Sequence, residues 1–261
     1  MRRLLIIGCG DVALRVAPQL RDRYRLYALT HSLERVPLLR AHGVVPITGD
    51  LDDAASLDAL AGIAHDVLHC APPPHRGTRD TRTAHLIAAL TKGKSLPQQL
   101  VYISTSGVYG DCEGAFVDET RVPRPPGTYS EARLPLAQLQ AGTPALRAAE
   151  DAYTNHIHAA DRARAAVAAL RFAHSGRAYN AADDSVLKMG DYFDLVADRF
   201  GLPRPQRISR AEAGQRIAPD LLSFMNESRR LSNRRIKQEL RLKLHYPTVR
   251  EGVAAQPPRR A

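Results

Sequence analysis

The sequence has 261 residues, of which 44% are hydrophobic and 25% are charged, the composition of an ordinary soluble globular protein. This length can bury a core without disulfides or a metal, and it fits one large α/β domain or a core with a smaller appended part. The net charge of +10 indicates either affinity for phosphate-bearing ligands or nucleic acid, or only a general richness in arginine. We favour the second interpretation and expect no nucleic-acid partner, because arginines alternate with acids and no basic run is interleaved with aromatic residues.

Three cysteines, Cys9, Cys70 and Cys112, lie far apart without the spacing of metal ligands, so we expect no metal site. An odd number of cysteines without a signal peptide indicates reduced thiols and a cytoplasmic protein. No apolar run approaches the roughly 20 residues that cross a bilayer, so we expect no membrane partner.

The N-terminal segment predicts a strand, a glycine turn and a helix, in that order. Residues 4–7 are all aliphatic, as in a parallel strand buried on both faces, and helical spacing begins after Gly10. Gly8 allows a sharp turn, and Gly10 admits a pyrophosphate close to the backbone and to the free amides of the helix start. The alternative is a turn that uses glycine only for its dihedral freedom. The residues predicted to hold the pyrophosphate are Gly8, Cys9, Gly10, Asp11 and Val12.

The end of the second predicted strand, residues 25–30, bears on the choice of coenzyme. An acid about 20 residues past the glycines would bind the ribose 2′-hydroxyl of NAD, and the strand end carries none. His31, Ser32 and Arg35 could instead hold the 2′-phosphate of NADP, which we therefore prefer over NAD. The alternative is that Glu34 and Arg35 are solvated residues of the next predicted helix, 33–42.

Two further loops are expected at the same end of the sheet. The third predicted strand, 44–48, precedes Asp50 and Leu51, which are suited to line an adenine pocket, although Asp50 could also cap the next helix. Ala71, Pro72 and Pro73 follow the fourth predicted strand, 66–70, and the prolines impose an extended edge beside the glycine loop.

The alternation of strands and helices predicts an α/β fold with a Rossmann-like doubly wound parallel sheet. The remaining elements expected in this half are a first helix over 11–20, a third over 79–90 and a fifth strand over 100–104.

Several segments resemble the NAD-dependent epimerase/dehydratase family, the extended or atypical short-chain dehydrogenases/reductases. They are residues 101–111 around the fifth strand, the acidic stretch 116–120, residues 154–161, and the C-terminal stretch 232–252. The glycine loop is similar to that of an atypical branch with a shortened loop. The resemblance covers nearly the whole chain and implies an NAD(P)-binding oxidoreductase or epimerase that acts on a carbonyl or alcohol of a sugar-like substrate.

The resemblance also implies catalytic residues. A hydroxyl after the fifth strand assists a catalytic tyrosine in that family, and Thr105 or Ser106 matches its position, although each could be a turn residue. Tyr129 has the spacing of the tyrosine, but Arg133 stands where the family has the lysine that lowers the tyrosine pKa. In a competing alignment Tyr129 follows the sixth strand of the family, and the helix and strand that carry the catalytic pair are missing. We favour the deletion, because no clear aliphatic strand lies between Glu119 and His156.

The sequence therefore allows two interpretations of the function, and an enzyme is the first. The alternative to an enzyme is a non-catalytic NAD(P)-binding sensor or scaffold that has lost the tyrosine–lysine pair.

The second half of the sequence predicts a mainly helical lobe. Helices are expected over 161–172, 190–200, 209–230 with an interruption near Pro219, and 232–240, and a strand over 177–181. His156 and His158 could be metal ligands, but a contact at the hinge to this lobe fits the resemblance better. We divide the chain into a dinucleotide-binding Rossmann core (1–120), an interlobe loop and substrate lobe (121–256) that can return to the core near 155–185, and a disordered tail (257–261).

Overall fold

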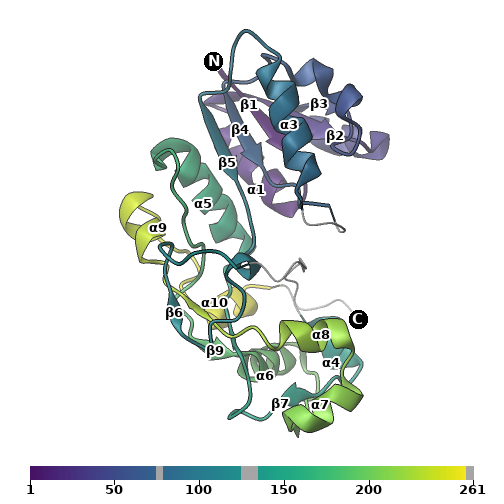
Figure 1. Ribbon diagram of the computed structural model, residues 1–261, viewed down its shortest axis with the longest axis vertical. Coiled ribbons are helices and arrows are strands. Elements are labelled where there is room, and N and C mark those ends of the chain that lie inside the picture. Colours follow the sequence, from purple (N-terminus) through teal and green to yellow (C-terminus); the bar gives the residue numbers. More distant parts are fainter. Residues whose placement is uncertain (75–78, 125–134, 257–261) are drawn as a thin grey trace. The chain divides into compact units, whose positions relative to one another are not determined.

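The computed structural model describes residues 1–74, 79–124 and 135–256 (Figure 1). Its contacts divide the chain into two compact units, which are described separately below. The first unit comprises Met1–Thr105, Ala159–Arg177 and Gln238–Leu242, and the second comprises Ser106–His158, Ala178–Lys237 and Lys243–Ala261. The predicted tail over 257–261 lies outside the described residues.

The first unit is built around a parallel sheet, which in the described part of the chain has five strands in the order β3-β2-β1-β4-β5. The strands are β1 (Arg2–Ile7), β2 (Tyr24–Thr30), β3 (Val44–Thr48), β4 (Asp66–His69) and β5 (Gln99–Tyr102). The strand order reverses between β1 and β4, and ligands of doubly wound sheets bind outside the carboxyl ends of the strands at such a point. The predicted Rossmann-like sheet is confirmed.

Alternation along β1 divides the core of this unit into two layers. Leu4 and Ile6 pack against α1 (Asp11–Leu20) and α5 (Ala159–Phe172), whereas Leu5 and Ile7 pack against η2 (Ala54–Leu60) and α3 (Thr81–Thr91). All four β1 side chains are at most 1% exposed, which explains the continuous aliphatic run in the sequence. The predicted helix over 33–42 begins as a 3₁₀ turn, η1 (Leu33–Arg35), and continues as α2 (Val36–Ala41).

Among its described residues, the second unit contains three two-stranded sheets and several helices. β6 (Phe116–Val117) pairs with β11 (Arg230–Leu231), β7 (Ala145–Leu146) with β10 (Arg207–Ile208), and β8 (Tyr153–Thr154) with β9 (Leu187–Lys188). The other elements are η3 (Ser106–Tyr109), α4 (Leu136–Gln140), α6 (Met189–Phe200), α7 (Arg210–Arg216), α8 (Pro219–Phe224), α9 (Arg234–Glu239) and α10 (Val249–Ala254). Phe193, Val196 and Ala197 of α6 lie in its hydrophobic core.

Residues 106–120, which the sequence places in the Rossmann core, cluster with the second unit. The backbone explains this, because Cys112 and Gly114 donate to the carbonyl of Ser228 at 3.0 and 2.9 Å, and β6 pairs with β11. Residues 159–177 cluster with the first unit, within the range where the sequence allows a return to the core.

One predicted element of this part of the chain is wrong. A second, the helical stretch over 209–230, is confirmed as α7 and α8 with the expected interruption before Pro219, but its predicted end is wrong. Residues 177–181 form no strand, because their backbone groups are satisfied by side chains: Asn180 donates to Glu119 at 2.7 Å, and the carbonyl of Ala178 accepts from Arg235 at 3.2 Å. The predicted helix over 209–230 ends at Phe224, and Arg230 instead belongs to strand β11. The helix expected over 190–200 is confirmed as α6, which ends where Gly201 adopts a φ of 64°.

The edge of the main sheet bears on the proposed deletion. β5 is the outer strand, with Leu100 and Tyr102 41% and 39% exposed. In the described part of residues 119–156 the only strands are β7 and β8, of two residues each, and both pair outside the main sheet.

All three cysteines are free. Within the described ranges, no helix is both long enough and apolar enough to cross a membrane.

Candidate functional site

Gly8 forms the turn that follows β1. Its φ of +84° lies in the left-handed region, and a Cβ at this position would lie 2.4 Å from the backbone nitrogen of Ala71. Both the turn and the close approach of the loop after β4 therefore require glycine here. The two loops meet at the point where the strand order reverses.

Gly10 differs from Gly8 because the chain itself does not require glycine there. Its φ of −80° and ψ of −163° are accessible to any residue, and a Cβ would meet no atom of the described residues within 4 Å. Gly10 is the N-cap of α1, and the first amide bonded within the helix is that of Leu14, to the Gly10 carbonyl at 3.1 Å. The preceding amides point out of the helix start, where the helix dipole favours an anion.

Asp11 and Val12 occupy the first turn of α1. The Asp11 carboxylate accepts two hydrogen bonds from Nε of Arg15, at 3.0 and 2.9 Å, so its charge is balanced on the helix surface. Val12 is half-buried and packs against the hydrophobic core of the sheet.

Arg35 joins the loop after β2 to the glycine loop, because its Nη2 donates to the carbonyl of Cys9 at 2.5 Å. The Arg35 guanidinium therefore lies against the glycine loop and does not extend into solvent alone. Ser32 lies in a tight turn in which its amide donates to Thr30 Oγ1 at 3.3 Å, and His31 is exposed. The structure therefore brings the predicted phosphate-binding arginine to the predicted pyrophosphate loop.

The thiols of Cys9, in the glycine loop, and of Cys70, in the loop after β4, add no charge to this site. Burial raises the pKa of Cys9 to about 12, although the Arg35 cation opposes the shift. Burial likewise raises the pKa of Cys70 to about 12. Both thiols are neutral near pH 7 and impose no repulsion on an anion at the glycine loop.

The loop after β3 carries Asp50 and Leu51. The Asp50 carboxylate accepts from the amide of Asp52 at 2.9 Å, and the Leu51 side chain is buried. The suggestion that Asp50 caps the following helix is wrong, since Asp53 caps it by accepting from the amide of Ala55 at 3.1 Å.

In the loop after β4, Ala71 is buried and its amide donates to Nδ1 of His69 at 3.3 Å. Pro72 and Pro73 continue it outside any helix or strand. Sequence reasoning missed Arg82 and His85 of α3, which contact this loop and the loop after β3. No local signal marks them, because the partners of Arg82 lie 30 and 10 residues away.

The structure describes two of the three predicted catalytic residues, Thr105 and Ser106. Thr105 ends the first segment of the first unit and Ser106 begins the second unit, and both residues are half-buried. Tyr129 and Arg133 lie outside the described residues.

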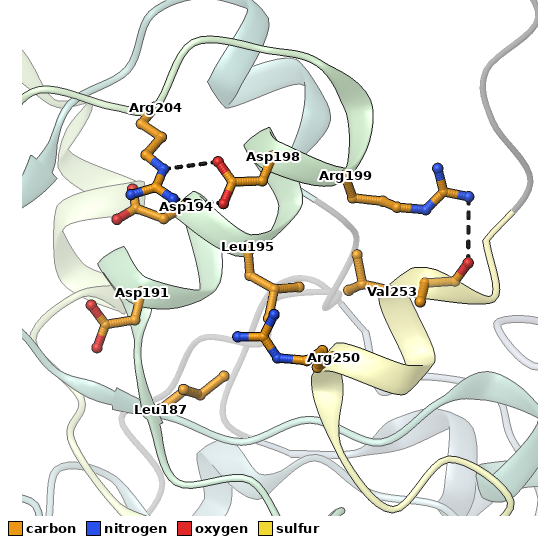
Figure 2. A pocket seen from close by; sticks show the side chains of 10 residues that line it. Leu187, Asp191, Asp194, Leu195, Asp198, Arg199, Arg204, Arg250 and Val253 are labelled. Carbon is orange, nitrogen blue, oxygen red and sulfur yellow. Dashed lines mark hydrogen bonds and ion pairs between the residues drawn. The ribbon is translucent and has the colours of Figure 1, made fainter.

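The second unit has a pocket of about 420 Å³ lined by three aspartates, three arginines and small apolar side chains (Figure 2). Its charges are largely used within the protein: Asp198 binds Arg204 at 2.8 and 2.7 Å, and Arg199 donates to the carbonyl of Gln256 at 2.6 Å. No glycine is among the residues that line the pocket.

His156 and His158 pack against aromatic rings rather than against each other. The ring centroids lie 4.0 Å apart for His156 and Tyr192, and 3.9 Å apart for His158 and Tyr246. Burial lowers the pKa of His156 to about 4. Among the described residues, no group of three or more His, Cys, Asp or Glu side chains could hold a metal ion.

The strand order, the reversal point and the glycine loop together define a Rossmann-like α/β protein. No protein-family model matches the chain, and no curated protein matches it either. Solved structures, however, match it over nearly its full length.

Three solved structures illustrate the match. A conserved protein of unknown function from Silicibacter pomeroyi is 24% identical, with a TM-score of 0.76 and 98% of each chain covered. The UDP-glucose 4-epimerase of Thermotoga maritima, solved with UDP-glucose, is 14% identical, with a TM-score of 0.73 and 97% of this chain and 96% of that chain covered. The human epimerase family protein SDR39U1, solved with NADPH, is 14% identical, with a TM-score of 0.71 and 97% and 98% covered. This chain shares their fold.

Proposed function

We propose that this chain is an NAD(P)-binding protein of the NAD-dependent epimerase/dehydratase family and that it prefers NADP(H). The observation that carries the proposal is the open space beside Gly10, at a helix start that faces the reversal point of the sheet. Neither the dihedral angles of Gly10 nor its packing require a glycine, so the space where a side chain would lie is free for a group from outside the chain. The helix start carries a partial positive charge, which suits the negative charge of a pyrophosphate.

Each part of the coenzyme has candidate residues. The backbone of Gly8, Cys9 and Gly10 and the first turn of α1 would hold the pyrophosphate. His31, Ser32 and Arg35 would hold the 2′-phosphate, and the Arg35 contact with Cys9 favours this assignment. The adenine side would be lined by Asp50, Leu51, Ala71, Pro72 and Pro73.

The nicotinamide coenzyme supplies the hydride donor or acceptor when bound. The residues of the chain orient it and exclude water, and the hydroxyl of Thr105 or Ser106 would hold the oxygen of a carbonyl or alcohol substrate. Tyr129 is the candidate proton donor or acceptor. The solved structure with UDP-glucose supports a sugar-like substrate, and the one with NADPH supports the coenzyme.

A non-catalytic NAD(P)-binding sensor or scaffold is the second candidate. The position of β5 at the sheet edge favours it, because a missing helix and strand would remove the tyrosine–lysine pair with them. Reductase assays of the wild type, Thr105→Ala and Tyr129→Phe separate the two candidates. Turnover that falls in the variants supports the enzyme, whereas NADPH binding without turnover supports the sensor.

Titration of NADPH and NADH by fluorescence tests the coenzyme. We expect tighter binding of NADPH, and we expect Arg35→Ala to lose about 10-fold in NADPH affinity with little change for NADH, since a charge-assisted hydrogen bond is removed. Arg35→Lys is the control that keeps the charge. A wild-type chain that binds neither coenzyme would refute the proposal, and equal losses for both coenzymes in Arg35→Ala would refute the role given to Arg35.

A further inference from the structure

One arginine of α3 bridges two loops at the carboxyl end of the sheet. Arg82 donates from Nε and Nη2 to the two carboxylate oxygens of Asp52, at 2.8 and 2.6 Å. Its Nη1 donates to the carbonyl of Pro72 at 3.3 Å. Asp52 belongs to the loop after β3 and Pro72 to the loop after β4, so a single planar guanidinium sets the distance between the two loops.

His85 adds a second contact from the same face of α3, one turn further along. Its Nδ1 lies 2.8 Å from the carbonyl oxygen of Leu51, and it must be the donor because a carbonyl only accepts. Leu51 and Asp52 are neighbours, so α3 holds the loop after β3 at two consecutive residues.

The start of α3 is itself fixed to the sheet. Asp80 caps the helix by accepting from the amide of Thr83 at 2.9 Å. Thr83 Oγ1 lies 2.9 Å from Nε2 of His69, the last residue of β4, which is only 1% exposed. Because the first turn of α3 is bonded to the sheet, the position of Arg82 is fixed relative to the sheet. Its side chain therefore fixes the positions of the two loops.

We propose that Arg82 is a positioning residue for the adenosine half of the coenzyme. The inference rests on the proposed function, because the two loops that Arg82 joins carry Leu51, Pro72 and Pro73. The Arg82 side chain is 23% exposed, and its guanidinium donates three hydrogen bonds to groups of the chain itself, two to Asp52 and one to Pro72. Arg82 therefore acts on the ligand through the two loops. Without Arg82, the loops spend a smaller fraction of time in the arrangement that binds the ligand, and the apparent affinity falls by the same factor.

A double-mutant cycle on Arg82 and Asp52 tests this proposal, with 2′,5′-ADP as a probe of the adenosine half and calorimetry as the measurement. We expect Arg82→Ala and Asp52→Ala each to weaken 2′,5′-ADP binding by about 10-fold. The double variant should lose no more than either single variant, because both remove the same link.

Lys92→Ala is the matched control. Lys92 is the C-cap residue of the same helix and forms an ion pair at 2.6 Å with Asp58, which also lies between β3 and β4. The exposed Lys92–Asp58 pair contributes little to stability, so Lys92→Ala should keep both the melting temperature and the 2′,5′-ADP affinity of the wild type. Arg82→Ala should lose 2′,5′-ADP affinity, and it should also lose some stability because the Arg82 side chain is mostly covered.

Two outcomes would overturn the role of Arg82. Wild-type affinity in Arg82→Ala would show that the link does not position the loops, and additive losses in the double variant would show that Arg82 and Asp52 act independently and not through their link. A wild-type chain that binds neither 2′,5′-ADP nor NADPH would instead overturn the proposed function.

Discussion

Different interactions stabilise the interior of each of the two units. In the first unit a parallel ladder of five strands satisfies the backbone and buries both faces of β1. In the second unit each strand that the structure describes has two residues, and polar side chains bond to the backbone of irregular segments. Asn155, for example, donates to the carbonyl of Arg229 at 3.0 Å and accepts from the amide of Leu231 at 2.7 Å.

This difference separates two kinds of site. The candidate pyrophosphate site is made of backbone amides at a strand–helix turn, so it depends on glycines and on little side-chain chemistry. The stretch that opens the second unit, where Ser106 lies, depends on side chains that reach across long intervals of sequence. We therefore expect substitutions at glycines to matter most in the first unit and substitutions of buried polar groups to matter most in the second.

The largest expected effect is that of Gly8→Ala. Alanine at a positive φ costs roughly 1–3 kcal/mol, and the 2.4 Å approach of its Cβ to Ala71 adds overpacking of similar size, so the total is about 2–6 kcal/mol. Gly43→Ala is the control, because Gly43 also has a positive φ, of +72°, but its Cβ would meet no described atom within 4 Å. Urea unfolding measures both variants. Equal losses would contradict the close approach of the two loops.

The second prediction concerns His156 and the stability of the second unit at low pH. Its pKa of about 4 lies below the ordinary value of 6.5, so the unfolded chain takes up the proton first as the pH falls. The stabilisation is complete above pH 6.5 and declines between pH 6.5 and 4, by about 3 kcal/mol for this shift of 2.5 units. His156→Phe keeps a ring against Tyr192 and removes the titrating group.

We expect the urea midpoint of the wild type to fall more steeply below pH 6.5 than that of His156→Phe. Other titrating groups contribute to both proteins alike, so the difference between the two curves isolates His156. Parallel curves would show that its ring is not buried in the neutral form.

A smaller effect is expected for Asn155→Ala. The variant leaves the carbonyl of Arg229 and the amide of Leu231 without their partner, which costs about 1–3 kcal/mol and lowers the melting temperature by roughly 2–4 °C for each kcal/mol. Asn226→Ala serves as the control, since Asn226 is exposed, and it should change stability by less than about 0.5 kcal/mol. If the two variants lose equal stability, the side-chain bonds of Asn155 do not hold the second unit together.

The sequence predicts the first unit well because its signals are local. Aliphatic runs, helical spacing and glycines locate the strands and helices to within two residues, and the strand over 44–48 and the helix over 11–20 agree at both ends. The glycine loop is likewise marked by neighbouring residues.

The elements that the sequence does not predict depend on distant partners. Residues 177–181 have the composition of a strand, but Asn180 bonds to Glu119, 61 residues earlier. Arg82 reaches Asp52 across 30 residues, and no periodicity marks either residue. The roles of Thr105, Ser106 and Tyr129 come from a resemblance alone, and they stay predictions.

Binding of NADPH to the Gly10→Ala variant tests the central claim most directly. The added methyl group meets no described atom of the protein, so the melting temperature should stay within about 2 °C of that of the wild type. It does occupy the space assigned to the pyrophosphate, so calorimetric titration should show NADPH affinity reduced by about 10-fold or more. Undiminished affinity in this variant would contradict the account, because the coenzyme would then bind somewhere other than the glycine loop.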